Sequence, residues 1–143
     1  MSLSCPLSGL AQVNLVVDDV PSARDWYSRF LGFDPYFQRP DPDCPAYVEY
    51  RVGDEKHELG IIDGKFVPEL LGKGPGGGVV RWHTEDIEGT VARLLELGAS
   101  EFEAITEREG GFLTASVLDP FGNILGLIYS PHYREVAARR VDV

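Results

Sequence analysis

The chain has 143 residues, of which 43% are hydrophobic and 25% are charged, and its formal net charge is −10. This length and composition are typical of a single globular domain with a real hydrophobic core. An acidic chain lacks the basic face that binding to phosphate backbones requires, and it is repelled by anionic membrane surfaces. We therefore expect neither nucleic acid nor a membrane as a partner.

The two cysteines, Cys5 and Cys44, form neither a disulfide framework nor a CxxC pair. No apolar stretch approaches the roughly 20 residues of a membrane span. The first residues lack the charged and apolar regions of a secretory signal. These features favour a reduced, cytoplasmic location.

One pattern occurs twice along the chain, in residues 19–32 and again in residues 86–98. In each copy a strand-like run ends in acidic residues, an amphipathic helix follows, and a glycine stops the helix. Such repetition predicts a single domain, residues 1–143, built from two similar modules. We place module one at about residues 9–68, a Gly-rich linker at 72–78, module two at about 79–130 and a C-terminal tail at 131–143.

In module one, alternating hydrophobicity predicts a strand over residues 10–17, with Val13, Leu15 and Val17 on one face. Asp18 or Asp19 is suited to cap the following helix, and Gly32 to end it. The helical spacing of Trp26 and Tyr27 favours the core over a ligand site. Further strands are expected at 36–38, 47–52 and 56–62.

The run from Gly72 to Gly77 matches GxGxxG, but it precedes a strand and does not open a helix, so a dinucleotide site is not indicated. The pattern then restarts with a strand at 79–84, a helix at 87–97 and strands at 100–105, 112–118 and 124–129. The sequence 119–122 (DPFG) fits a type I turn. The tail is expected to be a surface segment or a short helix.

These residues resemble a known family. The repeated pattern, the Leu15–Asp19 and Trp26-Tyr27 segments, the run 30–33 (FLGF) and the run 119–123 (DPFGN) are similar to the vicinal oxygen chelate superfamily of glyoxalases, bleomycin-resistance proteins and extradiol dioxygenases. The resemblance covers roughly residues 9 to 130. It implies an α+β fold in which two tandem βαβββ modules form an open, curved mixed sheet, the cup, with helices on its outer face.

In enzymes of this superfamily, side chains on the first and fourth strands of each module hold a divalent metal. The resemblance carries these positions to Gln12, Glu58, Val79 and Gly126. Gln12 and Glu58 are able to act as ligands, whereas Val79 and Gly126 have no donor atom in their side chains. Two oxygen ligands hold a transition metal poorly. We therefore expect no metal site and no cofactor.

Strand alternation predicts which side chains share the cup, and these are Gln12, Asn14, Glu58, Arg81 and His83. Space is expected at Gly60, Val79 and Gly126, and we predict an ion pair between Arg81 and Glu58. The alternatives are that Gln12 and Asn14 are polar residues of a solvated sheet face and that His83 is a surface histidine.

The favoured interpretation is a glyoxalase- or bleomycin-resistance-like protein that binds a small organic molecule without a metal. The alternative is a glyoxalase-like lyase or isomerase with Glu58 as general base, assisted by His83. Whether the protein is an enzyme stays open. Extradiol dioxygenase activity is disfavoured, because no histidine occupies the matched positions. A homodimer is expected, because open curved sheets leave edges to cover.

Overall fold

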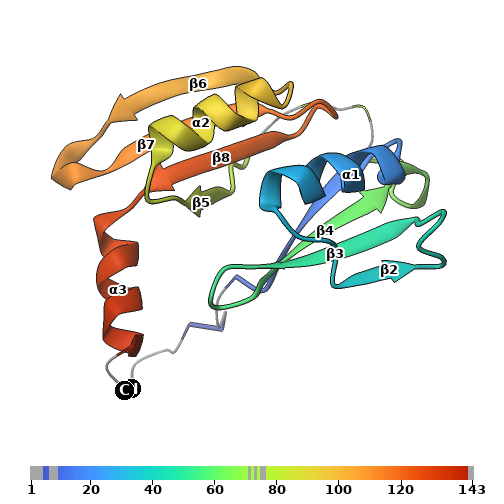
Figure 1. Cartoon of the computed structure of the whole chain (residues 1–143), viewed down its shortest axis with the longest axis horizontal. Coiled ribbons are helices and arrows are strands. Elements are labelled where there is room, and N and C mark those ends of the chain that lie inside the picture. The colour runs from blue at the N-terminus through green and yellow to red at the C-terminus, as the bar shows by residue number, and fades with distance from the viewer. Residues whose placement is uncertain (1–4, 7–9, 71, 73, 75–76, 142–143) are drawn as a thin grey trace.

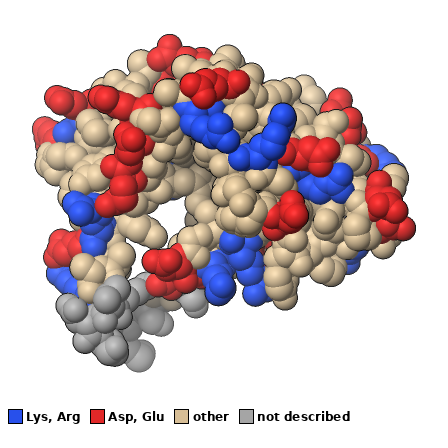
Figure 2. Space-filling view, in the orientation of Figure 1, with Lys and Arg blue, Asp and Glu red and all other residues tan. Residues whose placement is uncertain are grey.

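The computed structural model describes the chain except for residues 1–4, 7–9, 71, 73, 75–76 and 142–143. The predicted linker at 72–78 therefore lies partly outside the described residues. Two similar units stand side by side, and a C-terminal helix projects from the second (Figure 1). Acidic side chains are spread over the visible face, with basic ones between them (Figure 2).

The first unit contains β1 (Gln12–Val17), α1 (Val20–Leu31), β2 (Phe37–Arg39), β3 (Tyr47–Val52) and β4 (His57–Asp63). The second contains β5 (Arg81–His83), α2 (Ile87–Glu96), β6 (Ser100–Glu107), β7 (Leu113–Leu118) and β8 (Ile124–Tyr129). Short 3-10 turns follow β4 (Gly64–Phe66) and β6 (Glu109–Gly111), and α3 (Pro131–Val141) is the predicted tail. No helix among the described residues is long and apolar enough to cross a membrane.

The predicted α+β fold of two βαβββ modules is confirmed. Each module forms its own four-stranded mixed sheet, with strand orders β1-β4-β3-β2 and β5-β8-β7-β6. In both, the first strand pairs in parallel with the last, and the other pairs are antiparallel. Because β1 and β5 are edge strands of separate sheets, the modules are held together by side chains.

The helix boundaries follow the same chemistry in both modules. The carboxylate of Asp19 accepts a hydrogen bond from the Ser22 amide at 3.1 Å, and that of Asp86 accepts one from the Gly89 amide at 3.0 Å. Each cap satisfies a backbone N–H that has no partner inside its helix. Gly32 ends α1 with a φ of 88°, in the left-handed region that glycine adopts without strain.

Strand β5 is shorter than predicted: it covers residues 81–83, and Val79 lies outside it. The Val80 carbonyl still accepts a hydrogen bond from the Gly126 amide at 3.1 Å. Residues 81–83 form a strand as predicted. Strand pairing with β8 begins only at Arg81, where the chain leaves the Gly-rich segment.

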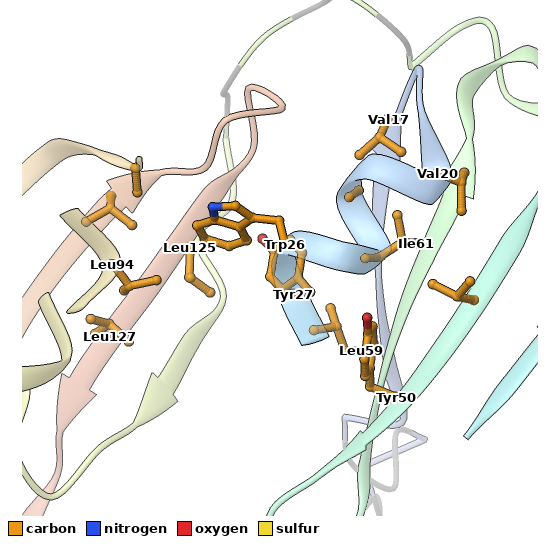
Figure 3. Packing of buried hydrophobic residues seen from close by; sticks show 14 of the residues in the cluster. Val17, Val20, Trp26, Tyr27, Tyr50, Leu59, Ile61, Leu94, Leu125 and Leu127 are labelled. Carbon is orange, nitrogen blue, oxygen red and sulfur yellow. The ribbon is translucent and has the colours of Figure 1, made fainter. Parts of the chain in front are cut away.

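Two aromatic residues of α1 join the modules. Trp26 and Tyr27 are buried, and their side chains lie between the sheets (Figure 3). The Trp26 indole N–H donates to the Leu97 carbonyl at 2.7 Å, and the Tyr27 hydroxyl donates to the Asp119 carboxylate at 2.6 Å. The predicted core role of both residues is confirmed.

Asp119 is the partner of this junction in module two. Its carboxylate also accepts hydrogen bonds from the backbone amides of Phe121 and Asn123, both at 2.9 Å. Burial raises the pKa of Asp119, although these hydrogen bonds and the one from Tyr27 act in the opposite direction. Burial also raises the pKa of Tyr27, so its hydroxyl remains a donor. The predicted turn at 119–122 is thus a structural anchor.

Replacing Tyr27 by Phe removes one donor from a buried carboxylate while keeping the ring. We expect Tyr27→Phe to lower the free energy of unfolding by about 1.5–3 kcal/mol, the usual range for a hydrogen bond to a charged group. Urea unfolding measures this change. The control is Tyr36→Phe at a residue that is 64% exposed. An equal effect in both variants would contradict the role of the hydroxyl.

Candidate functional site

The predicted site residues of module one share one face of its sheet. In the register, Gln12 lies opposite Glu58, and Asn14 lies opposite Gly60. Glu49 on β3 also lies opposite Gly60, so its side chain points to the same face. Tyr47, two residues before Glu49, shares this orientation. The opposite face carries buried residues such as Leu59 and Ile61 that pack under α1.

Five polar side chains on this face form one hydrogen-bonded group, which we call the amide–carboxylate cluster: Gln12, Asn14, Tyr47, Glu49 and Glu58. The Gln12 amide nitrogen lies 3.2 Å from the Tyr47 hydroxyl, 3.2 Å from a Glu49 oxygen and 3.3 Å from a Glu58 oxygen. The Asn14 amide donates to the Gln12 carbonyl at 3.1 Å, and the Tyr47 hydroxyl donates to Glu49 at 2.8 Å. The structure thus brings together three predicted residues and adds two.

The carboxylates of this cluster form no ion pair within 4.0 Å among the described residues, although the Arg39 guanidinium carbon lies 5.6 Å from the ring centre of Tyr47. Arg51 is opposite Glu58 in the register, but its guanidinium carbon lies 3.9 Å from the ring centre of Tyr36. Burial and the hydrogen bond to Glu49 raise the pKa of Tyr47, which keeps its hydroxyl protonated.

The space predicted at the glycines is filled. A Cβ added to Gly60 would lie 2.4 Å from the Asn14 side-chain oxygen and 2.7 Å from the Tyr47 hydroxyl. A Cβ added to Gly126 would lie 2.4 Å from the Val80 carbonyl oxygen and 2.8 Å from a methyl carbon of Val79. In both modules glycine allows neighbouring groups to approach closely. The prediction of open space at Gly60 and Gly126 is therefore corrected, whereas Val79 is 41% exposed.

The register also corrects the assumed correspondence between the modules. Asn14 and Arg81 each precede the helix cap of their module by five residues, and they lie opposite Gly60 and Gly126. Gly126 is therefore the counterpart of Gly60. Glu58 lies two residues before Gly60, so its counterpart is Ile124, two residues before Gly126. In module two the counterparts of Gln12 and Glu58 are Val79 and Ile124, and both have apolar side chains.

This donor set does not fit a metal held within one chain. Gln12 and Glu58 are adjacent, but module two offers no side-chain donor at the corresponding positions. Among the described residues, no group of three or more His, Cys, Asp or Glu could hold a metal ion. The interactions observed at the site are the hydrogen bonds of its own side chains.

Arg81 belongs to a different network. Its guanidinium forms an ion pair with Glu103 at 3.0 Å and donates to the Ala115 carbonyl at 2.9 Å. The Ser116 hydroxyl also donates to Glu103, at 2.7 Å. The predicted pair of Arg81 with Glu58 is therefore wrong, because a carboxylate of the same module satisfies the guanidinium.

His83 joins β5 to α3. Its Nδ1 accepts a hydrogen bond from the Ser130 amide at 3.1 Å, and its Nε2 contacts the Glu85 carboxylate. The hydrogen bond from the His83 ring lowers the pKa of the Glu85 carboxyl. The ring also stacks on Tyr133, with 4.5 Å between the ring centres. Both ring nitrogens are engaged away from the amide–carboxylate cluster.

Sequence reasoning did not assign Tyr47, Glu49 or Glu103 to a site. Alternation along β3 was sufficient to place Tyr47 and Glu49 beside Glu58, so that signal was available. Glu103 was harder to find, because register shifts on both sides of it interrupt the alternation of β6.

With this geometry known, comparison with other proteins identifies the family. The model of the glyoxalase/bleomycin resistance protein/dioxygenase superfamily matches residues 9–127. The chain belongs to this superfamily. None of the curated proteins matches the chain.

Several solved structures share the fold. A glyoxalase-related enzyme from Fulvimarina pelagi is 20% identical with a TM-score of 0.68, over 87% of this chain and 90% of that one. A superfamily member from Sphaerobacter thermophilus is 23% identical with a TM-score of 0.66, over 87% and 98%. TioX from Micromonospora sp. ML1 is 17% identical with a TM-score of 0.61, over 85% and 98%. At these identities the likeness shows the fold alone.

The Glu103 network generates a prediction about pH. The Ser116 hydroxyl, followed by Arg81, holds the pKa of Glu103 below its usual value of 4.5. A carboxylate with a lowered pKa stabilises the fold fully above the unfolded-state pKa, and this stabilisation is lost as the pH falls through the folded-state pKa. We expect Glu103→Gln to flatten the fall in melting temperature below about pH 4.5. Glu101→Gln, at an exposed position of the same strand, is the control. If the melting temperature falls with pH in the same way in wild type and both variants, the stabilising role of the Glu103 carboxylate is contradicted.

Proposed function

We propose that this protein binds a small organic molecule on the sheet face of module one, through the amide–carboxylate cluster and without a metal. The observation that carries this proposal is the convergence of Gln12, Glu49 and Glu58: both carboxylates lie within 3.3 Å of one amide nitrogen. A few converging polar groups beside apolar surface are typical of small-molecule sites. Membership of a superfamily that includes bleomycin-resistance proteins supports the same interpretation.

The charges of the cluster favour a ligand that donates hydrogen bonds or carries positive charge. Glu49 and Glu58 are acceptors, and no side-chain cation among the described residues is ion-paired with either. Carboxylates left without a cation bind ammonium or other donor groups strongly, because hydrogen bonds between charged partners are shorter and stronger than neutral ones. The net charge of −10 also steers cations toward the protein.

A second candidate is catalysis by Glu58 as a general base, as in a glyoxalase-like lyase or isomerase. The observation that favours it is that the Gln12 amide contacts this carboxylate at 3.3 Å, while no ion pair within the described ranges includes it. Such a group is free to accept a proton from a carbon next to a carbonyl. His83 is not required by this version, because its ring nitrogens bond elsewhere.

A melting screen against a library of small amines and neutral donors tests the proposal. A ligand at 100 times its Kd adds about 2.7 kcal/mol, which raises the melting temperature of a domain this size by about 5–10 °C. We expect Gln12→Leu and Glu49→Gln to weaken any hit at least tenfold. Glu101→Gln, which removes an exposed carboxylate of module two, is the matched control. Hits that bind both cluster variants as wild type does would contradict the proposal.

The same hits distinguish binding from catalysis. If Glu58 is a base, Glu58→Gln abolishes turnover of a hit while its Kd stays within about threefold. If the protein only binds, no hit is converted by wild type, and the variant changes only Kd. Product analysis by mass spectrometry and the binding titration separate these two results.

A further inference from the structure

A cavity of about 230 Å³ lies at the junction of the two modules, and Asn14 is the residue that it shares with the amide–carboxylate cluster. Its walls are mostly apolar side chains from both modules: Val13, Leu15 and Leu59 on one side, and Val80, Trp82 and Leu125 on the other. Gly74 and Gly78 border it with backbone alone. The wall residues of module one belong to the helix-covered face of its sheet, whereas the cluster lies on the other face.

The fold explains why this cavity exists. Strands β1 and β5 are edges of separate sheets, so no ladder of hydrogen bonds draws the modules together. Trp26 and Tyr27 bridge the modules through hydrogen bonds to Leu97 and Asp119. These contacts fix the separation of the two edges, and the space between them stays partly unfilled.

We propose that this cavity is a binding site for a small, neutral, flat organic molecule with one hydrogen-bonding group. The size agrees, because a cavity of about 150 Å³ already holds benzene, whereas drug-sized ligands need about 300 Å³ or more. One or two fused rings match the volume. Five of the six wall side chains named above are aliphatic and the sixth is the indole of Trp82, so the site suits a ring.

The polar groups at the cavity define the rest of the ligand. Within the described part of the chain no charged side chain lines it, so an ionised ligand would lose its hydration without a compensating partner there. Asn123 carries a side-chain amide in the lining, and it is fixed by donating to the Val16 carbonyl at 3.1 Å. Asn14 also borders the cavity, but its side chain lies on the cluster face and donates to Gln12 at 3.1 Å. A hydroxyl or carbonyl on the ligand finds a partner in the Asn123 amide.

The probe for this site is 2-naphthol, which has two rings and one hydroxyl. The chain has two tryptophans, and their indole N–H signals report separately by NMR: Trp82 lines the cavity, whereas the Trp26 indole N–H donates to the Leu97 carbonyl. We expect a saturable shift of the Trp82 signal with a Kd on the order of 0.1–1 mM. The Trp26 signal is expected to move little, and 2-naphthoate, the charged analogue, is expected to bind at least tenfold more weakly.

Cavity-filling variants test the location. Val13→Phe and, from the opposite wall, Val80→Phe are each expected to weaken 2-naphthol at least tenfold. Val16→Phe, the same change on the other face of β1, and Gln12→Leu in the cluster are expected to leave Kd within twofold. Two filling variants are used so that one remains informative if the other misfolds. A Trp26 indole signal at its wild-type position shows that a variant is folded.

The proposal is overturned if the Trp82 signal does not saturate, or if binding survives every filling variant that folds. It is also overturned if Gln12→Leu alone abolishes binding, because the probe then occupies the amide–carboxylate cluster. Binding of 2-naphthoate as tight as that of 2-naphthol contradicts the neutral ligand. The filling variants alter the cavity, whereas Gln12→Leu and Glu49→Gln alter the cluster, so either site can fail while the other stands.

Discussion

A buried hydrogen bond between residues 92 positions apart determines how the two halves of this protein meet. The Tyr27 hydroxyl of α1 donates to Asp119, which begins the turn between β7 and β8 of the other module. A carboxylate in this position is costly unless every lone pair has a donor, and two backbone amides supply the rest. The separation of β1 and β5, the cavity between them and the orientation of the sheet faces all depend on this anchor.

Local signals in the sequence predicted most of the fold. Alternation located β1, β3 and β8, and the acidic caps and Gly32 located the helices, because these preferences act over a few residues. The correspondence between modules was harder, because parallel pairing joins strands far apart in the chain, as with Gln12 and Glu58. The glycines were misinterpreted for a related reason: Gly60 and Gly126 lack side chains, but groups from neighbouring strands fill the space. Sequence alone does not say which neighbour fills it.

The two modules use the same backbone for different chemistry. In module two the side chain of Arg81 passes beside Gly126 and forms an ion pair with Glu103. The positive charge on that sheet face is therefore paired with a carboxylate. In module one an asparagine takes the equivalent place beside Gly60, and neither Glu49 nor Glu58 has an ion pair among the described residues. The candidate site for polar ligands is therefore in module one, and the candidate site for apolar ligands lies between the modules.

The central claim is that the amide–carboxylate cluster acts through its own side chains and needs no metal. Melting of the protein after treatment with a chelator, with Ni, Zn, Mn, Fe(II) and Co added back separately, tests this claim most directly. The account predicts no saturable rise in melting temperature with any of these ions. A saturable rise of about 5–10 °C with one ion, lost in Gln12→Leu, would contradict it, because Gln12 and Glu58 must then recruit further donors.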